Sequence, residues 1–274
     1  MKLFLNLLLL LFLFSNCNNT PQKENLLTTL QGDWIGADEE ALLMIDQHRM
    51  IENQPWLIKD WELFRIQGKE IVMNSIRIRK NEGIKKYRFD IRYKVDYLAN
   101  DTLRLIKHGI ADSTQQQVLQ LQRLQPLGQY DLKKLSISSS PCHGACPIFQ
   151  LEVKGNGQVK FQDDVFKEKK KNFSGKLNPN ALNLIRTQVD KIDWEKLAES
   201  YEEEAAGIQY FKVEMEDQRG QKYSLMTNST ESKAVNILIF RTFKLVESLE
   251  LKKTGEAFTF STDLIIEQQN NKQN

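Results

Sequence analysis

Residues 149–162, FQLEVKGNGQVKFQ, contain two short alternating runs on either side of a Gly-Asn-Gly turn. Phe149, Leu151 and Val153 alternate with polar residues before the turn, and apolar residues alternate again after it. Such alternation is typical of strands with one buried face. Asn-Gly between two such runs is a strong hairpin signal, because both central residues of a type I′ turn need positive φ. This stretch therefore predicts a β-hairpin at the centre of the C-terminal half.

The segments around the hairpin predict an α+β module. A strand is expected from Leu135, and a strand pair is expected at 210–215 and 222–226. One helix should start at Asn178-Pro179, because proline suits the first helical turn, and a second should start near residue 230. Both predicted helices carry apolar residues at steps of three and four: Leu182, Ile185, Val189 and Ile192 in the first, and Val235, Leu238, Ile239, Phe243, Val246 and Leu249 in the second. We expect an antiparallel sheet with helices on one face over residues 130–252, followed by a partly disordered tail at 253–274.

Residues 28–126 predict an all-β, barrel-like module. Short runs rich in apolar, β-branched and aromatic residues are separated by polar or Gly/Asn/Asp breaks; they lie at 41–45, 61–66, 70–78, 87–97, 102–106 and 118–124. This spacing is typical of an antiparallel barrel or sandwich. Proline and glycine together at 126–129 predict the boundary between the two modules.

The start of this region resembles the opening strand of lipocalin-like domains. The matching residues are Leu30-Gln31-Gly32-Asp33-Trp34, which carry a Gly-x-Trp motif. The resemblance implies that Gly32 and Trp34 form a barrel-plug motif, with the tryptophan closing one end. Because the segment is short for a full lipocalin, we expect a closed core filled by side chains.

The N-terminus predicts export from the cytosol. Residues 3–14 are almost wholly apolar, but a bilayer core needs about 20 residues in helix, so the run resembles the core of a signal peptide. Cys17 follows at once, which resembles the lipobox of bacterial lipoproteins, including those of Bacteroidota. The resemblance implies a signal peptide at 1–16, acylation of Cys17 with chains such as palmitate, and a tether at 17–27 that anchors the protein to a membrane of the cell envelope. Phe14-Ser15-Asn16 replaces the usual Leu-Ala-Gly, so ordinary cleavage and full secretion remain the alternative.

Composition limits the range of partners. The 38 basic and 36 acidic residues give a formal net charge of +2, which provides no general attraction for nucleic acid. Acylation of Cys17 would use the odd thiol of three and leave the even pair Cys142 and Cys146.

Three interpretations of Cys142 and Cys146 compete. A disulfide needs Cα atoms about 4.4–6.8 Å apart, so the chain must turn between them, and Gly144 can supply the turn. A redox role is disfavoured because thioredoxin-like sites use Cys-x-x-Cys at a helix N-terminus, whereas a strand follows here. A copper site through Cys142, His143 and Cys146 is the third, because two thiolates suit Cu(I). A structural disulfide is the favoured interpretation.

The cysteine segment also opens a family resemblance. Ser-x-Cys-x-Gly-x-Cys-Pro-x-aromatic, the Gly-x-Gly-x-Val-x-Phe hairpin, Gly175-Lys176, the two amphipathic helices and the strand pair resemble the family catalogued as domain of unknown function 6438, over about 131–251. Here Pro141 stands between the serine and the first cysteine. The resemblance implies an envelope location and this α+β fold, but no activity.

No cofactor is expected, and the sequence lacks the common catalytic motifs: a Gly-x-Ser-x-Gly elbow, His-Glu-x-x-His and a phosphate-binding glycine loop. We therefore expect a non-enzymatic binding or interaction module whose partner is a protein, a glycan or a small molecule. An extracytoplasmic copper or thiol-redox protein is the alternative.

Overall fold

The structure is a computed structural model. It describes residues 21–36, 41–52, 61–79, 85–108, 116–142, 146–163, 171–197, 209–228, 232–255, 258 and 260. The chain divides into two compact units, and the division falls between Arg123 and Leu124, next to the predicted boundary at 126–129. Within the described residues no helix is long and apolar enough to cross a membrane.

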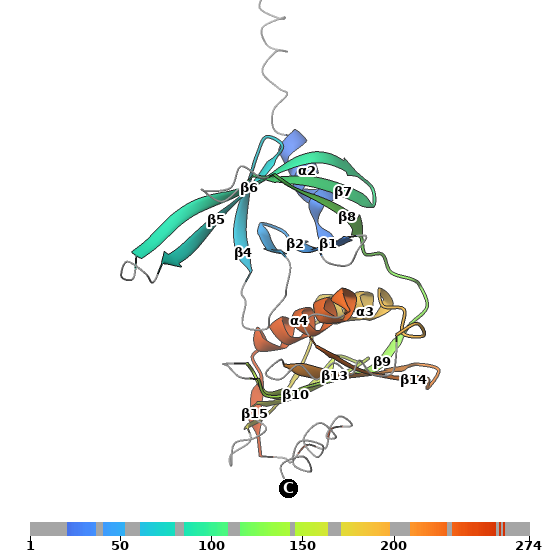
Figure 1. The fold of residues 1–274 in the computed structure, drawn as a ribbon. Helices are drawn as coiled ribbons and strands as arrows, with labels where there is room; N and C mark the ends of the chain where they lie inside the picture. Colours follow the sequence, from blue (N-terminus) through green and yellow to red (C-terminus); the bar gives the residue numbers. More distant parts are fainter. Residues whose placement is uncertain are drawn as a thin grey trace, which may run out of the picture. The chain divides into compact units, whose positions relative to one another are not determined.

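The first unit is a closed antiparallel barrel, drawn from blue to green in Figure 1. Its strands run in sequence order around the barrel: β1 Gly32–Gly36, β2 Leu42–Asp46, β3 Arg49–Glu52, β4 Glu62–Gln67, β5 Glu70–Arg79, β6 Lys85–Ala99, β7 Thr102–His108 and β8 Gln117–Arg123. β1 pairs with β8, which closes the sheet and leaves no free edge. The barrel prediction is confirmed, and β3 is the strand that the sequence analysis missed.

Alternate residues of these strands form one apolar core, to which Trp34, Ile71, Tyr93 and Leu121 contribute fully buried side chains. Exposed ion pairs such as Arg65 with Asp90 lie among the intervening residues. The interior of the barrel is therefore packed by side chains, while β2 is buried on both of its faces from Leu42 to Ile45.

A helix precedes the barrel, α2 Pro21–Leu30. Leu30 is buried in the barrel core, and Leu26 and Leu27 pack against that core while partly exposed. Residues 21–27, which the sequence analysis assigned to the tether, thus belong to a helix that contributes to the barrel core. Cys17 and the predicted signal peptide at 1–16 lie outside the described residues.

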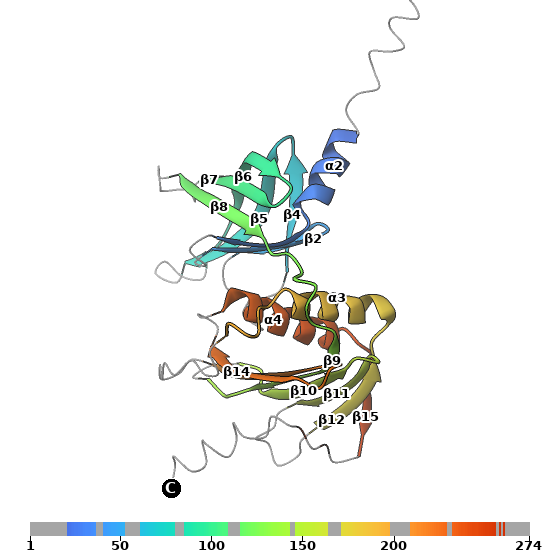
Figure 2. The same ribbon diagram turned by 90° about the vertical axis from the view of Figure 1, so that its right-hand side faces the viewer.

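In its described residues, the second unit is an antiparallel sheet with two helices. Its strands are β9 Leu132–Ser139, β10 Phe149–Lys154, β11 Gln158–Asp163, β12 Lys171–Lys176, β13 Tyr210–Asp217, β14 Lys222–Asn228 and β15 Lys252–Thr254. They pair in the order β14-β13-β9-β10-β11-β12-β15. The helices α3 Pro179–Asp190 and α4 Lys233–Glu247 lie on the same side of the sheet (Figure 2). The predicted α+β arrangement is confirmed.

The predicted hairpin is β10 with β11, in which Val153 faces Val159. Its turn differs from the expected type I′ turn. Gly157 has φ of 86°, while Gly155 and Asn156 do not have positive φ. Three residues connect the strands, so only the last must be left-handed to restore the strand direction, which is the role of Gly157.

Both helices start where side chains cap them. Asn178 accepts a hydrogen bond from the Ala181 N–H at 2.9 Å, directly before Pro179. The apolar stripe of α4 faces the sheet, where the Phe243 ring centroid lies 4.7 Å from that of Phe149. At its far end the sheet gains β15, whose last two residues fall in the predicted tail; residues 261–274 lie outside the described part.

Candidate functional site

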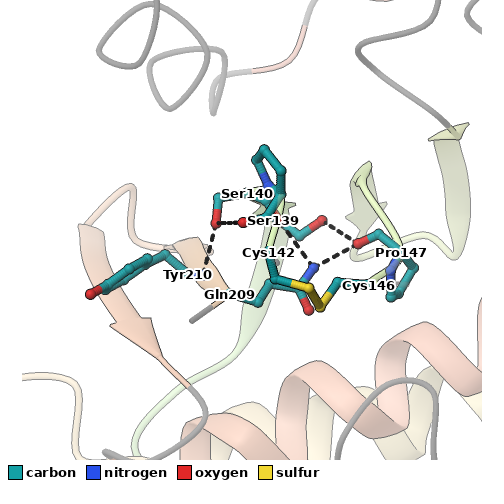
Figure 3. Close-up of a disulfide and its surroundings, with 8 residues drawn as sticks. Ser139, Ser140, Cys142, Cys146, Pro147, Gln209 and Tyr210 are labelled. Atoms are coloured by element: carbon teal, nitrogen blue, oxygen red, sulfur yellow. Dashed lines mark hydrogen bonds between the residues drawn. A yellow bond between two sulfur atoms is a disulfide. The ribbon is translucent and has the colours of Figure 1, made fainter. Parts of the chain in front are cut away.

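Cys142 and Cys146 form a disulfide in the segment between β9 and β10, with Cα atoms 5.9 Å apart (Figure 3). The predicted disulfide is therefore confirmed. His143 and Gly144, which the sequence analysis considered as a metal ligand and a turn residue, lie outside the described residues.

Hydrogen bonds hold both ends of the disulfide loop. The Ser139 hydroxyl donates to the Pro147 carbonyl at 3.0 Å and accepts from the Phe149 N–H at 2.9 Å. It thus links the last residue of β9 to the first residue of β10. The loop entrance and exit are joined by a side chain as well as by the disulfide.

A second side chain reaches the loop from β13. Gln209 comes directly before this strand, and its amide donates to the carbonyls of Pro147 at 2.7 Å and Ser140 at 3.1 Å. The Ser140 hydroxyl accepts from the Tyr210 N–H at 2.8 Å (Figure 3). Sequence analysis missed Gln209, because it is far from the cysteines in the sequence and no local motif marks it.

The two ends of the disulfide loop are held in place by these hydrogen bonds and by the disulfide itself. Both cysteine residues are partly exposed. Within the described ranges, no three His, Cys, Asp or Glu side chains are grouped as metal ligands. The chain runs from Cys146 into β10 at Phe149, so it lacks the helix N-terminus that lowers the thiol pKa in thioredoxin-like sites.

The Gly-x-Trp motif lies where the barrel closes. Trp34 is fully buried and its indole N–H donates to the Leu30 carbonyl at 2.8 Å. The guanidinium carbon of Arg123 lies 4.1 Å from the centroid of the Trp34 ring. A Cβ added at Gly32 would lie 2.8 Å from an Arg123 nitrogen, so this glycine leaves room for the arginine.

Arg123 also ties together three segments of the barrel. Its guanidinium donates to the backbone carbonyls of Gln31 and Thr29, and its Nε donates to the Asn100 carbonyl at 3.1 Å. Burial lowers the pKa of the arginine, while the nearby Asp101 carboxylate opposes that shift. Sequence analysis did not single out Arg123, because only the pairing of β1 with β8 brings it to Trp34.

A polar cluster of three side chains lies elsewhere in the barrel. The Tyr93 hydroxyl donates to the Glu52 carboxylate at 2.5 Å, and the Lys107 ammonium lies 2.7 Å from the same oxygen. Tyr93 is fully buried, and burial followed by the negative charge of Glu52 raises its pKa far above 10. All three groups are therefore satisfied by one another.

The comparisons with known proteins concern the second unit. No curated protein and no solved structure matches the chain. Residues 133–246 run from β9 to the end of α4 and include the disulfide loop. This part of the chain matches the family described as Domain of unknown function (DUF6438).

Proposed function

We propose that this protein is an extracytoplasmic, lipid-anchored binding protein in which the Cys142–Cys146 disulfide is structural. The observation that carries the proposal is the disulfide, held in a loop by Ser139 and Gln209. Disulfides persist in secreted and periplasmic proteins and are rare in the reducing cytosol. The cross-link therefore supports a location outside the cytosol.

The anchor in this proposal is Cys17. The apolar run at 3–14 directs export, and diacylation of Cys17 places the folded units at a membrane surface without crossing it. The lipid also accounts for the odd cysteine, because the other two are bonded to each other. No free thiol then remains on the mature protein.

Fractionation of cells tests this anchor. The protein with its native sequence should be in the membrane fraction and carry lipid on residue 17, whereas the Cys17→Ser variant should be soluble. Asn16→Ala is the matched control and should stay in the membrane fraction. A Cys17→Ser protein that still sediments with membranes would show that the anchor is wrong.

The binding role is proposed because side chains of the described residues fill the interior of the barrel. Tyr93, whose pKa is strongly raised, donates a hydrogen bond from its hydroxyl to Glu52 within the protein. These contacts stabilise the fold, which leaves the outer surfaces for a protein, glycan or small-molecule partner. The plug formed by Gly32 and Trp34 supports a lipocalin-like origin for the barrel.

The partial exposure of the residues Cys142 and Cys146 favours one second candidate, a thiol-redox or copper protein acting through Cys142, His143 and Cys146. Mass spectrometry of the purified protein under non-reducing conditions separates the two. If the disulfide is structural, it should be present in essentially all molecules, and no copper should be bound after incubation with Cu(I). A large fraction of free thiols with bound copper would overturn it.

A further inference from the structure

The two faces of the sheet in the second unit differ in chemistry. Cross-strand partners share a face, so Leu151 lies with Ile137 and Phe161, on the side where Phe243 of α4 packs. The intervening residues point to the other side. We call this side the polar face, and its central residues are Ser136, Ser138, Gln150, Glu152, Gln162 and Lys212.

The polar face is buried although both described helices of this unit lie on the opposite side (Figures 1 and 2). Ser136 is 0% exposed, Gln150 is 2% exposed and Gln162 is 4% exposed. Ser136, Ser138 and Gln150 each have an interaction partner. Side chains of this length on an open sheet face would be in contact with water, so another segment must cover them.

Two described residues show which segment approaches this face. The Lys160 ammonium lies 5.4 Å from the centroid of the Phe258 ring. Lys160 faces Glu152 across the β10–β11 pairing, so it belongs to the polar face. Phe260 contacts Phe258, with ring centroids 5.9 Å apart, and is only 3% exposed. Phe258, which follows β15 in the chain, therefore lies at the polar face.

We propose that the polar face is a peptide-binding surface and that the segment of the same chain that carries Phe258 and Phe260 occupies it. The hydroxyl and amide groups of Ser138, Gln150 and Gln162 are suited to the backbone N–H and C=O groups of an extended peptide. The aromatic ring of Phe258 suits the Lys160 ammonium. This inference goes beyond the proposed function, because it requires neither the lipid anchor nor a particular compartment.

A chain ending at Gly255 keeps β15 and removes the proposed occupant, which makes a test in solution possible. The probe is a fluorescent synthetic peptide of residues 256–267, and its anisotropy is measured against the truncated and the full-length protein. The truncated protein should bind the peptide at least tenfold more tightly than the full-length protein does. The control peptide has Phe258→Ser and Phe260→Ser and should bind the truncated protein at least tenfold more weakly.

A second measurement reports directly on the polar face. In a Cys17→Ser background, Ser138→Cys introduces one free thiol at a buried position of this face. A thiol reagent should modify it slowly in the full-length protein and at least tenfold faster in the truncated protein. Ser224→Cys is the control, because Ser224 is exposed on the same face and should react equally in both.

The truncated protein is suitable only if it shows a cooperative unfolding transition. If it does not, the thiol measurement uses instead the full-length protein with Phe258→Ser and Phe260→Ser. Faster modification at position 138 would then support the proposal. Equal peptide binding by the truncated and full-length proteins would overturn it. So would continued protection of position 138 in a folded protein that lacks the segment or its two phenylalanines.

Discussion

Arg123 covers the ring of Trp34 at the seam where the barrel closes. The two residues are direct partners across the β1–β8 pairing, and the guanidinium carbon lies 4.1 Å from the ring centroid. The same guanidinium donates to a carbonyl group in the last turn of α2 and to one in the β6–β7 turn. One side chain therefore joins the first strand, the last strand, the preceding helix and a distant turn.

Arg123→Met should lower the free energy of unfolding of the barrel by about 3 kcal/mol, because it removes a partly desolvated cation–π contact and several charged hydrogen bonds. Arg123→Lys should recover only part of this loss, because an ammonium cannot reach several carbonyls in a fixed fork. Urea unfolding followed by tryptophan fluorescence measures both.

Arg65→Met is the matched control. Arg65 pairs with Asp90 at 3.1 Å, but its side chain is 42% exposed, and such surface pairs contribute about 0–1 kcal/mol. Equal destabilisation of the barrel by Arg65→Met and Arg123→Met would show that the contacts of Arg123 at the seam do not contribute more than a surface ion pair.

As the pH rises into the alkaline range, the free energy of unfolding of the barrel should fall more steeply in the native protein than in a Tyr93→Phe variant. Burial and the charge of Glu52 raise the pKa of Tyr93, so the folded state keeps its proton while the unfolded state loses it above a pKa of 10.0. This contribution is fully present below that pH and decreases above it, by about 1.4 kcal/mol per pH unit. Tyr93→Phe removes this slope.

Unfolding in urea at about pH 9 and about pH 11 tests the difference. Near neutral pH the variant should also lose the Glu52 hydrogen bond, worth about 1 kcal/mol. Other tyrosines are present in both proteins, so their contribution cancels in the comparison. Equal dependence on pH in the two proteins would contradict the prediction.

Asp190→Ala should destabilise the second unit by about 2 kcal/mol. The Asp190 carboxylate accepts hydrogen bonds from the N–H groups of Gly128, Gln129 and Tyr130 at 2.8–2.9 Å. The predicted boundary segment is thus bound to the end of α3 and belongs to the second unit. A fragment that tests whether this unit folds alone should therefore begin at Leu124. Thermal unfolding of the full chain and of this fragment measures the effect of Asp190→Ala. Glu247→Ala, in an exposed pair with Lys244, should change little.

Replacing both Cys142 and Cys146 with alanine should lower stability by about 2 kcal/mol, because the closed loop is short. The protein should still fold, because Ser139 and Gln209 hold the loop ends. Ser139→Ala should cost more in this cysteine-free protein than in the native one, because the two restraints act on the same loop. Thermal unfolding of the four proteins gives the coupling, and strict additivity would show that the restraints are independent.

Much of the fold follows from local patterns. The alternation in β10 and β11, the spacing of apolar residues in α3 and α4 and the cap at Asn178 are all visible in the sequence. The close spacing of Cys142 and Cys146 made their disulfide predictable as well. These features depend on interactions among neighbouring residues, which composition and periodicity encode directly.

Other features depend on the tertiary structure alone. Arg123 reaches Trp34, Gln209 reaches Pro147 and Phe258 reaches Lys160 only after distant strands have paired in a particular order and register. The turn at Gly157 differs from the expected type because strand register decides how many residues the turn contains. The sequence by itself determined most of the strands, the helices α3 and α4, and the disulfide. The contacts that close the barrel, hold the loop and cover the polar face were decided by packing, because residues far apart in the chain meet only when the whole unit has folded.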